Sequence, residues 1–212
     1  MTAITHHISD AMLAAYAAGS LPHAFSVVVA THISMCAECR AALEAHHAVG
    51  GAVLETNEKA DLSSKMKSNV LAMLDEPAPA EEPIFKRQGI YPGPVLQTLK
   101  NRPVRWKRLG GGVRQDIIHA GDSGTVRLLY IPAGQAVPDH GHNGQELTLV
   151  LQGSFSDEAG RFGVGDVECA DEHLEHTPIA DSGATCICLA ATDAPLRFRS
   201  LVPRVLQPLF RI

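Results

Sequence analysis

The spacing of apolar residues changes character near the middle of the chain. Up to about residue 75 they recur every three or four positions, which is typical of amphipathic helices. Ser9 is a suitable helix N-cap and Pro22 a suitable first-turn residue, so each marks a helix start. The four expected helices begin after Ser9, near Pro22, at Ala37 (running to Leu54), and after Asp61. This half is predicted to be all-α.

Beyond about residue 100 the apolar residues form short runs that are separated by Gly, Asp and Pro turns. The clearest runs are Val126–Ile131, Leu147–Leu151 and Thr185–Ala191. Short strands at nearly regular spacing favour an antiparallel barrel or a double-sheet jelly roll.

A Pro- and Glu-rich stretch, DEPAPAEEP at 75–83, separates the two patterns and is typical of an extended linker. Pro92 and Pro94 are interpreted as prolonging it. We therefore expect four parts: a helical domain over residues 1–75, a linker over 76–100, a β domain over 101–200, and a C-terminal tail over 201–212.

Composition narrows the class of protein. Of 212 residues, 45% are hydrophobic and 19% charged, which excludes wholesale disorder. No apolar run approaches the roughly 20 residues of a membrane helix, and no signal peptide begins the chain. We expect a cytoplasmic protein without a membrane partner.

Charge is distributed unevenly. The net charge of −5 argues against a general nucleic-acid binder. The segment 86–114 nevertheless carries eight Lys and Arg and no Asp or Glu. It is either a solvated connector with the first strand of the β domain, or a contact for an acidic surface on the helical domain or a partner. Direct DNA binding is not expected, because the segment contains no recognition motif.

Eleven histidines and five cysteines fall into two groups, one on each side of the linker. In the first group, His32, Cys36 and Cys39 are spaced so that their side chains converge over about two helical turns. A closed zinc site needs a fourth ligand, for which we prefer His7 to His6. The competing interpretation is a redox pair or two buried thiols, but the strand that precedes a thioredoxin-like motif is missing. A bound zinc would also stabilise so small a bundle.

The second group follows the pattern G-x5-H-x-H-x3-E-x6-G from Gly134 to Gly153. Side chains two apart on a strand share a face, so His140 and His142 point together, and Glu146 can return to that face after a turn. For the fourth ligand we prefer His176 and keep His173 in reserve. Such ligands suit zinc, manganese, iron or nickel, and a site on a barrel wall can keep coordination positions open.

Cys186 and Cys188 lie in TCICLAA and would face the same side of a strand. They are either two small buried hydrophobic residues or a thiol pair near the metal that an oxidant could reach.

Together, the opening HHISDAMLAAYAAGSL, the His32-x3-Cys36-x2-Cys39 spacing and the downstream histidine motif resemble the ChrR family of zinc-binding anti-sigma factors, from about residue 5 to about 200. The resemblance implies an N-terminal all-α, four-helix zinc-binding anti-sigma domain and a C-terminal all-β cupin. It implies Zn²⁺ in the helical domain, and Zn²⁺ or another divalent metal (Mn, Fe or Ni) in the cupin. The implied ligands are His7, His32, Cys36 and Cys39 in the helical domain, and His140, His142, Glu146 and His176 in the cupin.

The resemblance also implies a function. The helical domain would sequester an extracytoplasmic-function (group IV) sigma factor in a one-to-one complex, partly through apolar faces of its first and fourth helices. The cupin would be needed for release of that factor under singlet oxygen or organic peroxide stress. One departure is that the second cupin motif, normally Pro before Gly and then His, is replaced by GVGDVECADEHLEH.

The chain is therefore expected to be a transcription regulator without catalytic residues. The alternative is a metal-dependent cupin dioxygenase or isomerase with an appended helical zinc domain. An enzyme would need acid/base or substrate-anchoring groups outside the metal ligands, and the sequence identifies none.

Overall fold

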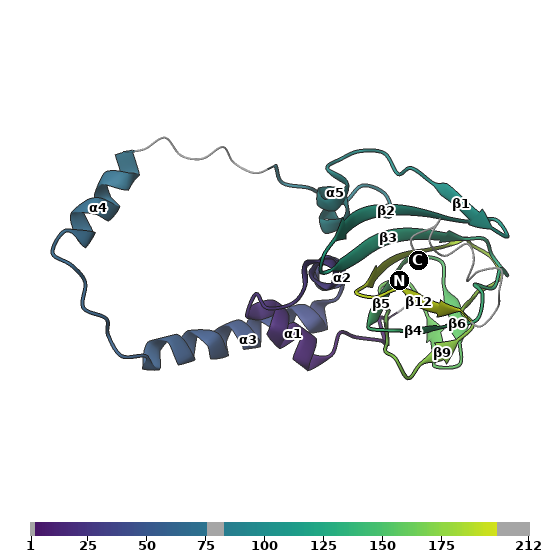
Figure 1. The fold of residues 1–212 in the computed structure, drawn as a ribbon, viewed down its shortest axis with the longest axis horizontal. Coiled ribbons are helices and arrows are strands. Elements are labelled where there is room, and N and C mark those ends of the chain that lie inside the picture. The colour runs from purple at the N-terminus through teal and green to yellow at the C-terminus, as the bar shows by residue number, and fades with distance from the viewer. Residues whose placement is uncertain (1–2, 76–82, 199–212) are drawn as a thin grey trace.

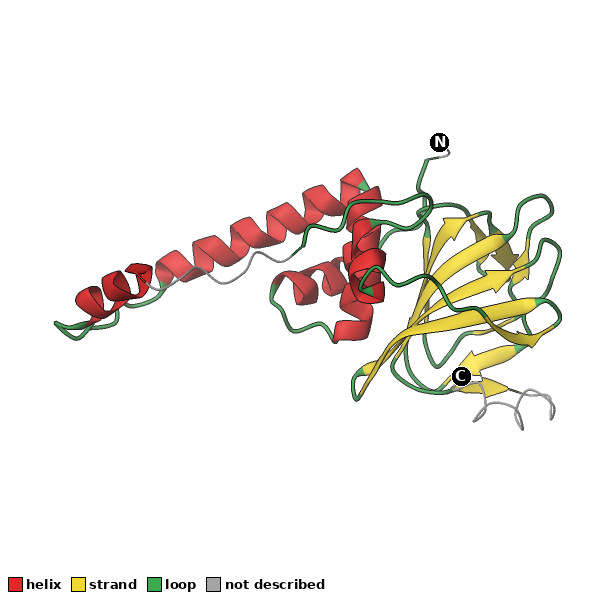
Figure 2. Cartoon of the chain, turned by 90° about the horizontal axis from the view of Figure 1, so that it is seen from above, coloured by secondary structure: helices red, strands yellow, loops and turns green. Residues whose placement is uncertain are grey.

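The computed structural model describes residues 3–75 and 83–198, so residues 76–82 of the proposed linker and the whole of the proposed tail lie outside the described residues. The chain folds into a helical part followed by a β part, as predicted (Figures 1 and 2). The helices are α1 (Asp10–Ala17), α2 (His23–Met35), α3 (Ala37–Thr56), α4 (Met66–Ala72) with a 3-10 turn η1 (Met73–Asp75), and α5 (Gly93–Leu99).

The local chemistry explains where the first three helices begin. The Ser9 hydroxyl accepts the Met12 N–H at 3.3 Å and caps α1, as the sequence predicts. Cys36 ends α2 and is also the N-cap of α3, where its sulfur accepts the Cys39 N–H at 3.5 Å. The joint between α2 and α3 therefore places both thiols at one corner.

The β part is a jelly roll built from antiparallel pairings. Its strands are β1 (Lys107–Gly110), β2 (Val113–Gly121), β3 (Gly124–Ile131), β4 (His140–His142), β5 (Glu146–Gln152), β6 (Phe155–Asp157), β7 (Gly160–Phe162), β8 (Val167–Ala170), β9 (Glu175–His176), β10 (Ile179–Ala180), β11 (Cys186–Thr192) and β12 (Leu196–Phe198). The large sheet has the order β1-β2-β3-β11-β5-β8, and the small sheets have the orders β10-β6-β7 and β12-β4-β9.

The helical and β parts share one hydrophobic core. Helix α2 lies against β3, β5 and β11 of the large sheet, and its Phe25 and Val28 belong to the same buried cluster as Leu149 and Leu189 of the sheet. Figure 2 shows the helices gathered on one side of this sheet. The two parts are therefore packed together through α2.

Helix α5 falls inside the range that we expected to be linker. Pro92 is its N-cap and Pro94 lies in its first turn, so the prolines that suggested extended chain begin a helix instead. Val95, Leu96 and Leu99 of α5 are buried in the shared core, and α5 packs on α2. The local composition predicted an extended linker, whereas burial of these three apolar side chains stabilises a helix over residues 93–99.

The basic segment 86–114 contains helix α5 and strand β1, and only about half of its residues are solvent-exposed. Arg102 of this segment forms an ion pair within the same chain: its guanidinium contacts Asp116 of β2 at 2.7 and 3.0 Å. Asp116 also accepts the Arg105 N–H at 2.8 Å. Among residues 3–75 and 83–198, no helix combines the length and apolar character needed to cross a membrane.

Candidate metal centres

The four residues proposed as ligands in the helical part converge on one point. His7, His32, Cys36 and Cys39 each offer an atom within 4.8 Å of the others. The His7 Nδ1 lies 3.4 Å from the Cys36 sulfur and 3.6 Å from the Cys39 sulfur, and the His32 Nε2 lies 3.2 Å from the Cys39 sulfur.

These distances fit a tetrahedral metal site. With Zn–S near 2.3 Å and Zn–N near 2.0 Å, the nitrogen–sulfur edge of a tetrahedron is roughly 3.5 Å. Burial lowers the pKa of His32, which favours the neutral imidazole that a metal needs. Burial also raises the pKa of Cys39 to about 11, so a bound cation is needed to stabilise the thiolate at neutral pH.

Three of the four residues proposed for the β part also converge. His140 and His142 lie on β4, and His140 is paired with His176 of β9. The His176 Nε2 lies 3.2 Å from the His140 Nε2 and 3.3 Å from the His142 Nε2. All three side chains are buried.

Three ring nitrogens at this separation fit a shared metal, because metal–nitrogen bonds of about 2.1 Å place cis nitrogens roughly 3.0–3.4 Å apart. Glu146 lies beside this group and not within it. Its carboxylate is 3.8 Å from the His142 Nδ1 and accepts the Thr148 hydroxyl at 2.8 Å. The structure thus brings three proposed ligands together and holds the fourth at the edge.

Two buried carboxylates, which the sequence reasoning missed, support His176 from behind. The His176 Nδ1 lies 2.6 Å from Asp157 of β6 and 3.2 Å from Glu168 of β8. A donated Nδ1–H leaves Nε2 free to bind a metal. Asp157 stands in a turn-like SDEAG stretch and Glu168 in the altered second motif, so spacing alone could not pair either with His176.

Burial and these contacts also shift the pKa values of Glu168 and His176. Burial raises the pKa of Glu168 to about 7, against the hydrogen bond from His176. Burial alone would lower the pKa of His176, but the hydrogen bonds and charges of Glu168 and Asp157 outweigh it and raise that pKa to about 9. Without a metal, His176 is therefore expected to carry protons on both ring nitrogens at neutral pH.

Comparison with known proteins identifies the family. Residues 96–195 match the ChrR cupin-like domain. The anti-sigma-E factor ChrR of Cereibacter sphaeroides is 55% identical over 211 residues, which cover 99% of both chains. The chain belongs to the ChrR family. The resemblance drawn from the two histidine motifs is thereby confirmed.

A solved structure agrees over most of the chain. The crystal structure of Rhodobacter sphaeroides SigE in complex with the anti-sigma ChrR contains a chain that is 54% identical to this one. The match has a TM-score of 0.79 and covers 90% of this chain and all of that chain. The ChrR fold, with its helical and cupin parts, is therefore shared.

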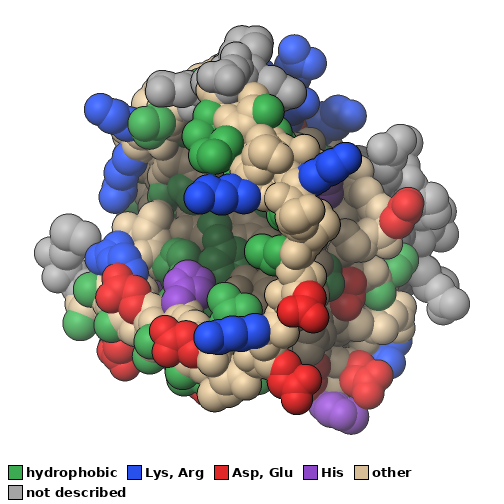
Figure 3. Space-filling model, turned by 90° about the vertical axis from the view of Figure 1, so that its left-hand side faces the viewer, with side chains coloured by type: hydrophobic (Ala, Val, Ile, Leu, Met, Phe, Trp, Pro, Cys, Tyr) green, Lys and Arg blue, Asp and Glu red, His purple; other side chains and the backbone are tan. Residues whose placement is uncertain are grey.

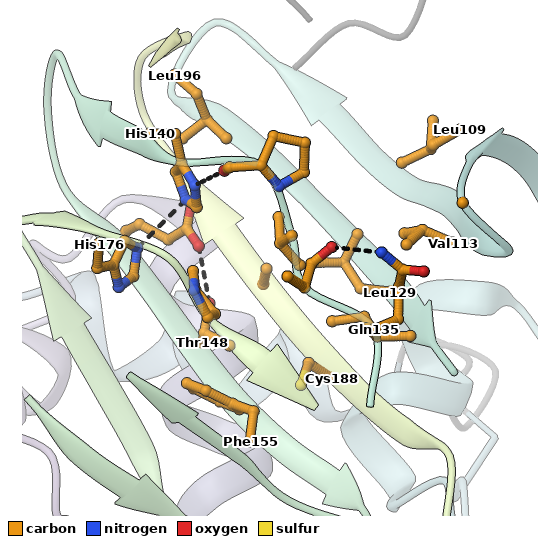
Figure 4. A pocket seen from close by; sticks show the side chains of 18 of the residues that line it. Leu109, Val113, Leu129, Gln135, His140, Thr148, Phe155, His176, Cys188 and Leu196 are labelled. Atoms are coloured by element: carbon orange, nitrogen blue, oxygen red, sulfur yellow. Dashed lines mark hydrogen bonds between the residues drawn. The ribbon is translucent and has the colours of Figure 1, made fainter. Parts of the chain in front are cut away.

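The cupin of this ChrR-family chain also contains a pocket of about 340 Å³ that is lined by His140 and His176. In Figure 4, His140 and His176 face each other at one side of the pocket, while Leu109 and Val113 lie at the opposite side. The remaining apolar lining includes Leu129, Ile131, Val137, Phe155, Leu196 and Phe198. A metal held by the histidines would thus border an apolar chamber.

Cys186 and Cys188 point to one side of β11, as predicted, with their sulfurs 3.5 Å apart and both side chains buried. Cys188 lines the same pocket as His140 and His176. Both thiols are therefore part of the hydrophobic core, and Cys188 also borders the pocket that His140 and His176 line.

The two histidines kept in reserve lie outside the clusters. The His173 side chain is 84% exposed and faces Glu172. The His6 Nδ1 lies 3.7 Å from Asp166, and its ring packs on Phe162. The structure thus favours His7 over His6 and His176 over His173.

Proposed function

We propose that this protein is an anti-sigma factor that sequesters an extracytoplasmic-function sigma factor in a one-to-one complex. A relative that is 54% identical was crystallised in complex with SigE, which supports the same class of partner here. Because sigma factors act on RNA polymerase, the proposed site of action is the cytoplasm. The observation that carries the proposal is a set of apolar side chains between Val49 and Leu74, on α3, α4, η1 and the loop before α4, that no other described residue buries.

This set of side chains, which we call the arm surface, is unusual for a small domain. The buried residues of α3, Cys39 and Leu43, lie in its first half, and α4 has no buried residue. The exposed apolar side chains of the arm surface are Val49, Val53, Leu54, Leu62, Met66, Val70, Leu71, Met73 and Leu74. Large apolar side chains exposed in such number on one part of a molecule are typical of a protein interaction site.

The shape of the helical part favours a macromolecular partner. In Figure 1 the end of α3 and the whole of α4 extend away from the rest of the molecule. Figure 3, which views this end, shows hydrophobic side chains within a hollow surrounded by charged ones. A seven-residue helix is marginal in water without packing partners, so α4 gains stability when a partner covers its apolar side.

Co-purification of the full chain with an extracytoplasmic-function sigma factor encoded nearby tests the proposal. Val70→Glu places a charge on the arm surface and is expected to weaken the complex at least tenfold, since desolvating that charge costs more than about 1.4 kcal/mol. Ser68→Glu adds the same charge to α4 at a polar position and serves as the matched control. Retention of wild-type affinity by Val70→Glu, or absence of any complex with the zinc-loaded wild type, would contradict the proposal.

We propose that the two metal centres have different roles, one structural and one in sensing. Zn²⁺ held by His7, His32, Cys36 and Cys39 would fasten the N-terminal segment to α2 and α3 and keep the helical part folded. Zn²⁺ or another divalent metal (Mn, Fe or Ni) would be held in the cupin by His140, His142 and His176, with Glu146 at the edge. The apolar chamber beside that metal would admit an oxidant such as singlet oxygen or an organic peroxide, and the reaction would release the sigma factor.

The chamber also favours a second candidate function, a metal-dependent cupin dioxygenase or isomerase. A buried Arg127 and the carboxylates Glu146 and Glu168 line it with the histidines, so polar groups are available to orient a small organic acid. Turnover of such a substrate by the full chain loaded with iron or manganese, abolished by His140→Ala and retained by His173→Ala, would support an enzyme. If no turnover is detected, the enzyme is contradicted and the anti-sigma function proposed above remains.

A further inference from the structure

A single cupin carboxylate holds the peptide that carries His7. Asp166 lies in the turn between β7 and β8, and its side chain is 6% exposed. One of its oxygens accepts the N–H groups of Thr5 and His6 at 2.7 and 2.9 Å, and the other accepts the Gly163 N–H at 2.7 Å. The same side chain therefore shapes the turn and anchors the residues immediately before His7.

The turn also holds the second histidine of the helical site. The Nδ1 of His32 donates to the Gly165 carbonyl at 2.9 Å, inside the buried interface. The Val167 N–H donates to the His6 carbonyl at 3.2 Å. Gly165 has φ +96°, and a Cβ at this position would lie 2.6 Å from the Ile4 side chain, so the N-terminal segment and the turn are in close contact.

The strand that leaves this turn supports the cupin site. Glu168 follows Asp166 by two residues and lies 3.2 Å from the Nδ1 of His176. Val167, between them, is paired with Leu149 of β5. Residues 165–168 thus contact one histidine of each metal centre, His32 through the Gly165 carbonyl and His176 through the Glu168 side chain.

From these contacts we propose that residues 163–168 are a positioning element for the helical metal site and couple it to the cupin site. Asp166 and the Gly165 carbonyl orient His7 and His32 toward the two thiols, and Glu168 ties the same backbone to His176. Loss of the cupin metal shifts Glu168 and with it the turn, and so loosens the helical site. This inference rests on the metal binding proposed above for the group that contains Cys36 and Cys39.

Cobalt exchange in the full-length protein tests the proposal. Co²⁺ bound to thiolates has an intense charge-transfer absorption, so its decay in excess chelator reports on the helical site, whose ligands include Cys36 and Cys39. Partners behind metal-bound histidines typically change metal affinity by about 10- to 100-fold. We therefore expect Asp166→Asn to accelerate the decay at least tenfold.

Two further variants separate positioning from general destabilisation. Thr5→Pro removes one of the N–H groups that Asp166 accepts and leaves every cupin residue in place, so it is expected to accelerate the decay even if Asp166→Asn folds poorly. Asp193→Asn is the matched control, because Asp193 likewise accepts a backbone N–H, that of Gln145, at 2.8 Å within the cupin. Its decay should stay within about twofold of the wild type.

The coupling is tested by emptying the cupin site with His140→Ala/His142→Ala. We expect this double change to accelerate the decay in the wild-type background and to add little in the Asp166→Asn background, since a shared route gives non-additive effects. Fully additive effects would overturn the coupling, and wild-type decay in both Asp166→Asn and Thr5→Pro would overturn the positioning role. If Co²⁺ gives no thiolate absorption, the proposed helical metal site itself is wrong. If the absorption forms but these variants do not change its decay, only the positioning role is wrong.

Discussion

The Nδ1 of His32 lies 2.9 Å from the carbonyl oxygen of Gly165, so a histidine of the helical part is oriented by a turn of the cupin. His32 is fully buried, and this bond leaves its Nε2 facing the Cys39 sulfur at 3.2 Å. A hydrogen bond between the two parts therefore selects the tautomer that can bind a metal. The helical site cannot be described without the cupin.

Removal of the thiols tests whether the helical site is structural. Cys36→Ser/Cys39→Ser is expected to lose the metal and the fold of the α1–α3 corner, because metal binding and folding are coupled in such sites. Binding to the sigma factor should fall with them. Metal content, circular dichroism and co-purification measure the three effects. Cys169→Ser is the control, since Cys169 is an exposed thiol on β8. Undiminished sigma binding by the double variant would contradict a structural role.

Removal of the cupin histidines should have a different effect. His140→Ala/His142→Ala is expected to abolish metal binding in the cupin and to blunt release of the sigma factor by oxidants. Without chelator and with zinc in excess, the helical site stays occupied in this variant, so the sigma factor is expected to remain bound. His173→Ala, which removes an exposed histidine, should leave the cupin metal and the release unchanged. The comparison requires release assays on purified complexes. If this variant and the thiol variant behaved alike, the proposed division of labour would be wrong.

The carboxylates behind His176 should set the metal affinity of the cupin. Glu168→Gln weakens an acceptor for the Nδ1–H of His176 and is expected to reduce affinity about 10- to 100-fold. Titration of the metal-free protein with the metal alone measures this. Glu172→Gln, at a side chain that is 69% exposed, provides the control. Equal affinities in the two variants would show that Glu168 does not support the ligand.

Metal binding in the cupin should also depend on pH in a defined direction. The pKa of His176 is raised to about 9 in the metal-free protein, so at neutral pH the metal must displace a proton. Apparent affinity is then expected to rise about tenfold per pH unit from pH 7 toward pH 9 and to level off above it. Calorimetry in buffers of different ionisation enthalpy should detect about one proton released from His176 at pH 7. A flat affinity over this range would contradict the raised pKa.

The shared core predicts that the helical and cupin parts unfold together. Phe25 of α2 is buried in the cluster that includes residues of the large sheet. Phe25→Ala is expected to cost about 3–5 kcal/mol and to lower one common transition, monitored by helix and sheet signals. Val49→Ala, on the exposed part of α3, should have little effect. Separate transitions, with the sheet signal unchanged in Phe25→Ala, would show that the parts fold independently.

Local sequence patterns determined much of this protein. The Ser9 cap, the first three helices and the three long apolar strands depend on spacing and turn chemistry within a few residues, and they form as predicted. The ligand motifs are equally local, because His32, Cys36 and Cys39 lie within eight consecutive residues and His140 and His142 are two apart on a strand. Family membership follows from the same motifs.

Only the tertiary structure decided the relations between distant residues. Asp157 and Glu168 meet His176 because three strands bring them together. Asp166 meets Thr5 across 161 positions of the chain. Helix α5 forms within an apparent linker because it buries Val95, Leu96 and Leu99. Periodicity is a property of neighbours in sequence, whereas these hydrogen bonds and this burial exist only once the helical part and the cupin have packed together.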